Sequence, residues 1–141
     1  MAGGLTVNTS VERYGPVFDG RAEVAVKEFE ASVTREAAAI GRDWIRIAAM
    51  AMDKSGRGGS GEAADGVVLN PVPGGWQIYG SMIKGRVWWP WLEGVSRRNA
   101  SSKFKGYHTF RTTKFKLSRS IPAIAEMKLA EYLPEMGGEA L

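Results

Sequence analysis

The first long pattern along the chain is a stripe of apolar positions that recur every three or four residues. The stripe consists of Ala22, Val26, Phe29, Val33, Ala37, Ile40, Trp44, Ile47 and Ala51. This spacing predicts one amphipathic helix of roughly nine turns, about 50 Å long, with Asp19 as its N-cap. Gly41 lies inside the pattern and costs about 1 kcal/mol relative to alanine, so a bend in the helix is expected there if anywhere. The helix is predicted to be a packing element, with Trp44 on its buried face.

The middle of the chain changes to short β-branched and aromatic runs. Val67–Leu69 and Trp76–Tyr79 are separated by a segment with two prolines and two glycines, which predicts an antiparallel hairpin. Arg86–Trp89 is predicted to be a third strand. Pro90 would end that strand or place it at an edge, because proline cannot donate a ladder hydrogen bond.

A second helix is predicted from Thr109 or Thr112, with a threonine as its N-cap. Its apolar face is less regular and consists of Phe115, Ile121, Ile124, Ala125, Met127, Leu129 and Leu133. Pro122 either breaks this segment in two or begins a fresh helix at its first turn. The pattern as a whole predicts an α+β fold, with a long N-terminal helix and a C-terminal helix packed on a small antiparallel β-sheet.

The chain of 141 residues is long enough for one domain with its own core. Residues 1–17 are predicted to be a flexible N-terminal arm, with room for a short strand at Leu5–Val7. Residues 18–134 form the single α+β domain, which includes a flexible Gly-rich loop at 53–65. Residues 135–141 are expected to be a C-terminal tail.

Composition narrows the classes of protein to which the chain can belong. It has no cysteine, which excludes disulfides and thiolate metal sites. It has no apolar run of about 18 residues, so no transmembrane helix is predicted. Its N-terminus does not have the pattern of a signal peptide. We therefore expect a protein made in a reducing cytoplasm and stabilised by packing alone, with no membrane partner.

The charges are unevenly distributed. From Gly94 to Ala125 there are eight Lys or Arg and no Asp or Glu, while the other 11 Lys and Arg are outnumbered by 15 Asp and Glu. A molecule with a basic face and an acidic face is suited to self-association into a ring, or to contact with an acidic partner such as DNA. The alternative is that the basic residues belong to a solvated loop and helix start.

Three of the five tryptophans lie within four residues. The segment contains Trp88, Trp89 and Trp91, stiffened by Pro90 and followed by Leu92 and Glu93. Each indole has a large apolar surface to bury, so we expect this segment in the core or at a subunit interface. Glu93 is predicted to form a buried ion pair with Arg97 or Arg111.

Residues that could support catalysis are isolated from one another. His108 is the single histidine and has no acidic neighbours in sequence with which to bind a metal. The serines of the basic segment lack a Gly-x-Ser-x-Gly context. Glu93 lacks the second carboxylate that a glycosidase requires. The sequence therefore predicts no enzyme, no cofactor and no metal site.

Cations and aromatic residues alternate from Lys103 to Arg111, a composition used for phosphate contacts and base stacking. The basic residues expected to face a partner or DNA are Arg97, Arg98, Lys103, Lys105 and Arg111. The alternative is that Phe104, Tyr107 and Phe110 pack into the core while the cations point outward. No DNA-reading motif indicates sequence-specific recognition.

The segment Trp88-Trp-Pro-Trp-Leu-Glu93-Gly94 is similar to a motif of the form aromatic–x–x–hydrophobic–Glu–Gly, and Lys103–Arg111 follows it as a basic and phenylalanine-containing part. On these residues the chain resembles the tail-completion or head–tail joining (neck) proteins of long-tailed double-stranded DNA bacteriophages. It is most similar to the versions from phages of actinobacteria. The resemblance covers roughly residues 20–133. It departs from the family at Ser55–Gly61, where a Thr-Gly–x–Leu-like segment is usual.

The resemblance implies a structural virion protein, located in the neck or tail and assembled in the host cytoplasm. Proteins of this family form rings, usually hexameric, that complete the tail and join it to the capsid connector. The implied partners are further copies of the chain, the major tail tube protein, neck and connector proteins, and genome DNA passing through the channel. The alternatives are a tail terminator ring that caps the tail tube, or a nonspecific DNA-binding protein.

Overall fold

The computed structural model describes residues 4–10, 20–53 and 61–134. Its elements, in chain order, are β1 (Leu5–Val7), α1 (Gly20–Asp53), α2 (Glu62–Asp65), β2 (Val67–Val72), β3 (Gly75–Gly80), α3 (Trp89–Glu93), α4 (Arg97–Ala100) and α5 (Thr109–Tyr132). Two long helices and a three-stranded antiparallel sheet make this an α+β fold, which confirms the predicted class.

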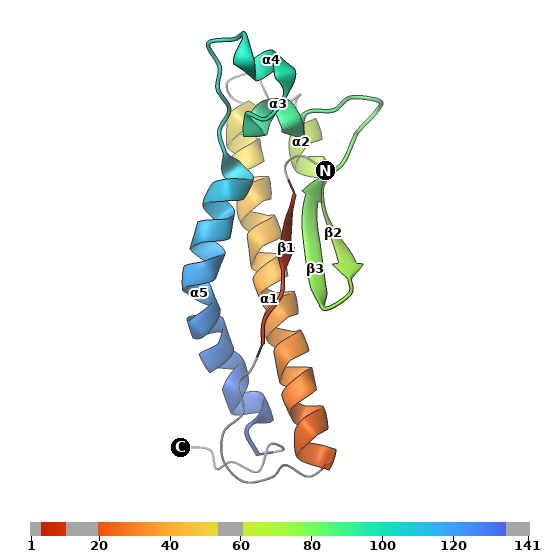
Figure 1. The fold of residues 1–141 in the computed structure, drawn as a ribbon, viewed down its shortest axis with the longest axis vertical. Helices are drawn as coiled ribbons and strands as arrows, with labels where there is room; N and C mark the ends of the chain where they lie inside the picture. The colour runs from red at the N-terminus through yellow and green to blue at the C-terminus, as the bar shows by residue number, and fades with distance from the viewer. Residues whose placement is uncertain (1–3, 11–19, 54–60, 135–141) are drawn as a thin grey trace.

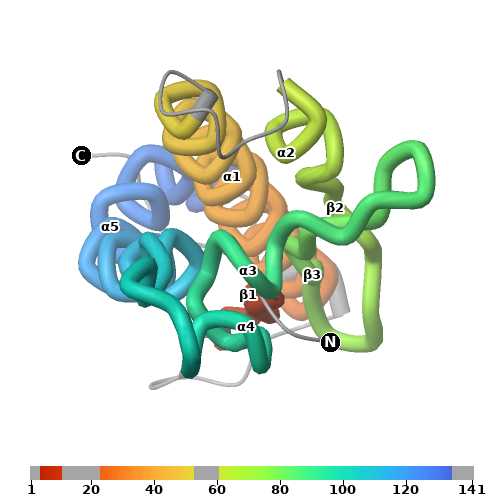
Figure 2. The backbone as a smooth tube through the Cα atoms, turned by 90° about the horizontal axis from the view of Figure 1, so that it is seen from above, coloured from red at the N-terminus to blue at the C-terminus, as the bar shows by residue number. Residues whose placement is uncertain are grey.

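The two long helices set the shape of the molecule. α1 and α5 run antiparallel and side by side along its long axis, as Figure 1 shows. β2 and β3 lie beside α1 on the side away from α5 (Figures 1 and 2). The short helices α3 and α4 gather at the end where α1 finishes and α5 begins. The residues that resemble the phage motif therefore lie at one end of the molecule.

The buried face of α1 follows the predicted stripe only in its first half. The buried residues there are Val26, Phe29, Val33 and Ala37. In the second half Ile45, Ala49 and Met52 are buried, whereas the predicted Ile47 is 63% exposed and Ala51 is also exposed. α1 is contacted by α2 as well as by α5 and the sheet. The buried face of its second half is turned towards α2, which is why it differs from the predicted stripe. The predicted N-cap, Asp19, lies outside the described residues.

α1 continues through Gly41 without interruption, and this glycine marks a close approach of two other elements. A Cβ added there would lie 2.7 Å from Cδ1 of Leu117 on α5 and 2.8 Å from Cδ1 of Ile78 on β3. Both of those side chains are buried. Glycine at this position lets the second helix and the central strand reach the same point of α1, so its unfavourable helix propensity is offset by packing.

The sheet has β3 in the middle, with β1 on one side and β2 on the other, both antiparallel to it. β2 and β3 are the predicted hairpin. The short strand expected at Leu5–Val7 is present as β1, so these residues belong to the sheet rather than to a free arm. Beyond β1, the Thr9 hydroxyl lies 2.6 Å from the Thr34 hydroxyl on α1 and donates to the carbonyl of Glu30. Residues 11–17 of the predicted arm lie outside the described residues.

The third strand predicted at Arg86–Trp89 is wrong. Arg86 pairs with Ile83 in an isolated bridge, and Trp89 begins α3. Pro90 lies in the first turn of α3. Backbone N–H groups there have no acceptor within the helix, so the lack of one in proline costs no hydrogen bond, and the fixed φ of proline suits a helix. The predicted loop at 53–65 is also shorter than expected, because Asp53 ends α1 and Glu62–Asp65 form α2. Residues 54–60 and 135–141 lie outside the described part.

The second helix differs from its prediction at three points. α5 begins at Thr109, with His108 rather than a threonine at the N-cap position, and it continues through Pro122 without a break. Its buried residues are Thr109, Phe110, Thr113, Leu117 and Ile124. Phe115 and Met127, which were predicted to be on the apolar face, are 66% and 67% exposed, and Leu129 is 38% exposed. The irregular spacing of apolar residues on this helix did not define a single apolar face. The face that is buried is the one that packs against α1.

Within the described ranges, none of the helices combines the length and the apolar character that crossing a membrane requires.

The packing around Gly41 gives a first testable prediction. Gly41→Leu should lower the free energy of unfolding by about 1–3 kcal/mol, because the new side chain would push against Leu117 and Ile78 in a filled core. Urea denaturation measures this change. Arg46→Leu, at an exposed position of the same helix, is the control and should be nearly neutral. An equal effect of the two substitutions would mean that the close approach is absent.

Candidate functional site

Trp89 and Leu92 of the indole-rich segment are core residues, with exposed fractions of 1% and 0%. The indole N–H of Trp89 donates to the carbonyl of Ala63 at 2.9 Å, and its ring meets Phe110 edge-on with 5.0 Å between centroids. A Cβ added at Gly80 would collide with the same ring. Trp89 therefore joins α2, β3 and α5 in the core. The core was one of the two locations predicted for this segment.

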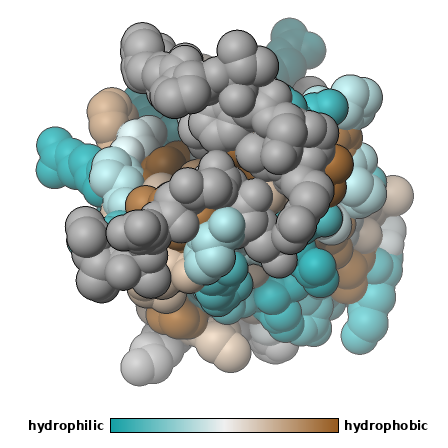
Figure 3. Space-filling model, turned by 90° about the horizontal axis from the view of Figure 1, so that it is seen from below, coloured by the Kyte–Doolittle hydropathy of each residue, from teal (hydrophilic) through white to brown (hydrophobic). Residues whose placement is uncertain are grey.

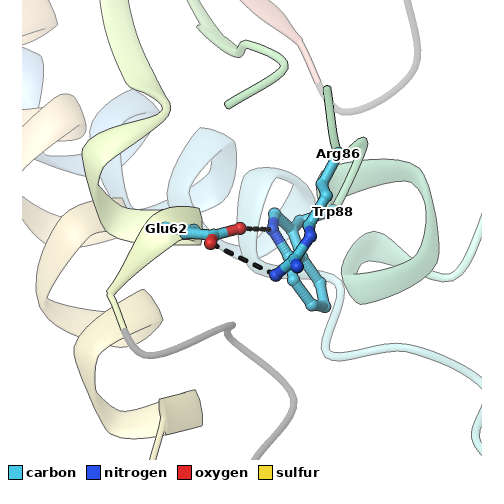
Figure 4. Close-up of polar contacts among 3 residues, drawn as sticks. All are labelled: Glu62, Arg86 and Trp88. Atoms are coloured by element: carbon cyan, nitrogen blue, oxygen red, sulfur yellow. Dashed lines mark hydrogen bonds and ion pairs between the residues drawn. The ribbon is translucent and has the colours of Figure 1, made fainter. Parts of the chain in front are cut away.

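Trp88 is partly buried and anchors the chain that leads into α3. Its indole N–H donates to one carboxylate oxygen of Glu62 at 2.7 Å. Arg86 donates to the other oxygen of the same carboxylate at 3.3 Å. Figure 4 shows Glu62 reaching from α2 to both side chains. Glu62 had no role in the sequence-based predictions, because no sequence pattern links it to residues more than 20 positions away.

Trp91, also partly buried, faces the basic segment. The guanidinium carbon of Arg98 lies 4.2 Å from the centroid of the Trp91 ring, within range of a cation–π interaction. Phe104 lies 4.8 Å from Trp91 and 5.0 Å from Tyr107, measured between ring centroids. These aromatic residues form a connected row, and Phe110 is buried, as in the alternative in which the rings pack and the cations point outward. Tyr107 remains 38% exposed, so this ring is only partly covered.

Glu93 is buried, 6% exposed, at the end of α3. One carboxylate oxygen accepts the backbone N–H of Phe110 at 2.9 Å, and the other accepts that of Arg111 at 3.1 Å. In the described structure Glu93 thus caps α5 and forms no ion pair with the guanidinium of Arg97 or Arg111, which corrects that prediction. The N-terminus of a helix favours a negative charge through its free N–H groups and its dipole.

This carboxylate replaces a cap that the neighbouring residues do not provide. His108 occupies the N-cap position with a left-handed φ of 54°, and among the described residues its side chain caps no N–H of α5. Gly94 ends α3 with a φ of 97°, and a Cβ added there would collide with the carbonyl of Lys105. The Glu-Gly pair of the motif therefore brings the end of α3 against the start of α5.

The basic loop between α3 and α5 is held by its own polar contacts. Ser96 and Asn99 form a capping box on α4, and the Asn99 amide donates to the carbonyls of Trp91 and Phe104 at 3.0 and 3.2 Å. Lys105 donates to the carbonyls of Asn99 and Ala100 at the end of α4, at 3.1 and 3.2 Å. Lys105 is therefore partly committed to the loop, although it remains exposed.

The five basic residues predicted to face a partner are all exposed and are here called the basic end. They are Arg97, Arg98, Lys103, Lys105 and Arg111. Four of them lie on α4 or in the loop after it, and the last lies in the first turn of α5. The one acidic residue beside them in sequence, Glu93, is buried, so the exposed part of this segment is positive. Figure 3 views the opposite end, where hydrophilic and hydrophobic residues lie side by side on the described surface.

A groove lies between α1 and α5, at a place that the sequence pattern did not indicate. Trp44, which was predicted to lie on the buried face of the helix, is partly buried and packs against the core while it also lines this groove. The groove has a volume of about 390 Å³ and is lined by Trp44, Ala48, Ala51, Met52, Tyr107, Thr109, Thr112, Thr113 and Lys116. Trp44 is only partly buried, and the ammonium of Lys116 lies 5.9 Å from the centroid of its ring. Ile47, one turn away on α1, is 63% exposed, and nothing in the sequence pattern distinguishes it from the buried residues of the stripe.

Among the residues described here, no three His, Asp or Glu side chains come together in a way that could hold a metal ion. His108 lines a hollow of about 290 Å³ with Glu93, Arg111 and Lys114. The Glu93 carboxylate in that hollow is already engaged by two N–H groups. Within the described residues this arrangement offers structural contacts and a charged surface.

Comparisons of the chain with protein-family models, with curated proteins and with solved structures found no match. The resemblance to phage neck proteins therefore depends on the quoted motif, and it stays a prediction.

The capping role of Glu93 gives the second testable prediction. Glu93→Ala should lower the free energy of unfolding by about 2–3 kcal/mol, because two backbone N–H groups lose a charged acceptor in a buried place. Glu93→Gln, which keeps one acceptor oxygen, should fall between this variant and the unchanged chain. Urea denaturation again provides the measurement. Glu126→Ala, which removes an exposed glutamate from the body of α5, is the control, and a similar loss there would argue against the cap.

Proposed function

We propose that this chain is a structural virion protein of a long-tailed phage. In this proposal it forms a ring, hexameric by the resemblance, at the head–tail junction or the tail end. The ring completes the tail and joins it to the capsid connector. Its partners are other copies of the chain, the major tail tube protein and the neck or connector proteins. The residues resembling the phage motif and the charge distribution support this proposal.

The main support for the proposal is the structural role of the motif residues. Trp89, Leu92 and Glu93 are buried, and Glu93 receives two N–H groups of α5. A buried carboxylate engaged in this way holds the start of α5 in place. The motif positions the helix and the basic loop, which is the role expected of a signature in a scaffold protein.

The basic end supports a contact with an acidic surface. Arg97, Lys103 and Arg111 are exposed, and Arg98 is presented on the ring of Trp91. Opposite charges on two partners fix their relative orientation and speed their encounter more than they raise affinity. In a ring, the basic end would meet an acidic region of the next subunit, of the tail tube or of the connector. A tail terminator ring would use the same surface.

A nonspecific DNA-binding protein is the second candidate, and the same exposed cations favour it. Phosphate contacts require Lys and Arg on an accessible surface, with no need for base recognition. Two features reduce this capacity. Lys105 is hydrogen-bonded to the end of α4, and the rings of Trp91, Phe104 and Tyr107 pack against one another in tilted and edge-on contacts. The contacts among the rings leave less aromatic surface for base stacking than the sequence composition predicted.

Immunogold labelling of virions from the phage that encodes this chain tests the proposal. We expect gold particles at the junction between head and tail, or at the tail end, because a ring subunit remains in the finished particle. Tails assembled without the protein should fail to join to heads. Virions without label, together with normal particles in the absence of the protein, would contradict the proposal.

Charge reversal separates the two candidates. The triple variant Arg97→Glu, Arg98→Glu and Lys103→Glu should fold normally and fail to assemble, while the unchanged chain binds duplex DNA only weakly. Sedimentation and DNA mobility shifts at several salt concentrations measure the two properties. The double variant Lys27→Glu and Lys128→Glu, remote from the basic end in the fold, is the control. Strong, steeply salt-dependent DNA binding that the triple variant alone abolishes would instead favour the second candidate.

A further inference from the structure

The second half of α1 has two apolar stripes, and the described elements cover only one of them. The covered stripe consists of Ile45, Ala49 and Met52. The other, here called the open stripe, consists of Trp44, Ile47, Ala48 and Ala51, which are partly buried or exposed. Its spacing of i, i+3, i+4 and i+7 is that of a helix face that packs against another element. α2, α5 and the sheet all contact α1, and the open stripe still keeps access to solvent.

The groove of about 390 Å³ between α1 and α5 follows the open stripe. Its lining residues from α1 include Trp44, Ala48 and Ala51, and those from α5 include Thr109, Thr112 and Lys116. Two further apolar residues extend the surface beyond the groove. Ile47 lies one turn from Trp44, Phe115 lies one turn from Thr112, and they are 63% and 66% exposed. An exposed apolar surface that is continuous in this way marks a site of interaction.

The arrangement of the two walls favours a helix as the occupant of the groove. α1 and α5 run antiparallel and side by side, so the groove between them follows their axes (Figure 1). The open stripe extends over two turns of α1, about 11 Å at the rise of an α-helix. An amphipathic helix that lies in an apolar groove makes its contacts through residues at the same i, i+3, i+4 and i+7 spacing.

The charges around the groove favour an acidic occupant. Lys116 lines the groove, and its ammonium lies 5.9 Å from the centroid of the Trp44 ring. The first half of α5 has four exposed cations and no Asp or Glu, namely Arg111, Lys114, Lys116 and Arg119. Residues 42–53 of α1 contain two Arg and two Asp, and Asp43 is already paired with Arg42 at 3.3 Å. The walls of the groove therefore have an excess of positive charge, which comes from α5.

We propose that the α1–α5 groove binds an acidic amphipathic helix of another protein. The apolar side of that helix would face Trp44, Ile47 and Phe115, with carboxylates beside Lys116. Trp44 is the expected anchor, because aromatic residues at the centre of an interface contribute most to binding. The opposite charges would fix the orientation of the bound helix. The inference goes beyond the proposed ring, because the partner is a different protein and the groove is not part of the basic end.

Isothermal titration calorimetry with two designed peptides tests the inference. The acidic peptide has about 18 residues, or five helical turns, with leucine at i, i+3, i+4 and i+7 and glutamate or alanine elsewhere. The basic peptide has lysine in place of every glutamate. We expect the full chain to bind one acidic peptide, with a Kd roughly tenfold or more below that for the basic peptide. No binding of the acidic peptide, or equal binding of the two, would overturn the inference.

Two matched pairs of substitutions locate the contact. Ile47→Ser with Phe115→Ser removes exposed apolar surface at the groove and should raise the Kd for the acidic peptide roughly tenfold or more. Met82→Ser with Val87→Ser is the control pair. These two residues are 62% and 63% exposed in the turn between β3 and α3, which projects on the side away from α5 (Figure 2). Circular dichroism checks that both double variants are folded. An equal loss of affinity in both would contradict the proposed contact.

Charge reversal tests whether the cations of α5 select the partner. Lys116→Glu should weaken binding of the acidic peptide and strengthen binding of the basic one. Lys103→Glu, at an exposed position of the basic end, is the control and should have a much smaller effect on both. The opposite result, in which only Lys103→Glu weakens binding of the acidic peptide, would place the peptide on the basic end and overturn the inference.

The indole N–H signal of Trp44, assigned by its loss in Trp44→Phe, reports on the groove by NMR. We expect this signal to shift as the acidic peptide is added. Decanoate, a small apolar acid, tests the alternative of a small-molecule site: a shift with decanoate and none with the peptide would overturn the inference. None of these results depends on where immunogold labelling finds the chain, so failure of the inference and failure of the proposed function are distinguishable.

Discussion

The carboxylate of Glu93 joins the end of α3 to the start of α5. It is buried at the end of α3 and accepts the first free N–H groups of α5, which no side chain next to that helix satisfies. Close by, the N–H of Tyr107 donates to the carbonyl of Leu92 at 2.7 Å. These contacts fix the direction in which α5 leaves the basic loop. The packing of α5 along α1, and with it the shape of the groove and the place of the basic end, depends on that direction.

The indole-rich segment distributes its three rings among three tasks. Trp89 fills the core between α2, β3 and α5. Trp88 is bonded to Glu62 of α2, and Trp91 supports the guanidinium of Arg98. The segment holds the basic end in a fixed geometry. An exposed, ordered and charged surface is suited to recognition by another protein, which is why we favour a scaffold role.

Much of the fold could be predicted from the sequence because it depends on local patterns. The helical stripe from Val26 to Ala37 and the hairpin around Gly74 require nothing beyond spacing and turn chemistry. The errors arise where residues far apart in the sequence determine the local structure. Glu93 was expected to pair with an arginine, whereas it accepts N–H groups at the N-terminus of α5. Gly41 has a low helix propensity, but α1 continues through it and Leu117 and Ile78 pack closely against it. The groove between α1 and α5 depends on tertiary contacts that no spacing in the sequence reveals.

Amide hydrogen exchange at Phe110 and Arg111, followed by NMR, tests the central claim most directly. Backbone N–H groups in the first turn of a helix have no helical acceptor and normally exchange rapidly. With Glu93 in place we predict slow exchange at both amides, comparable with the interior of α5, and rapid exchange at both in Glu93→Ala. Rapid exchange at these two amides in the unchanged chain, while the rest of α5 is protected, would contradict the account.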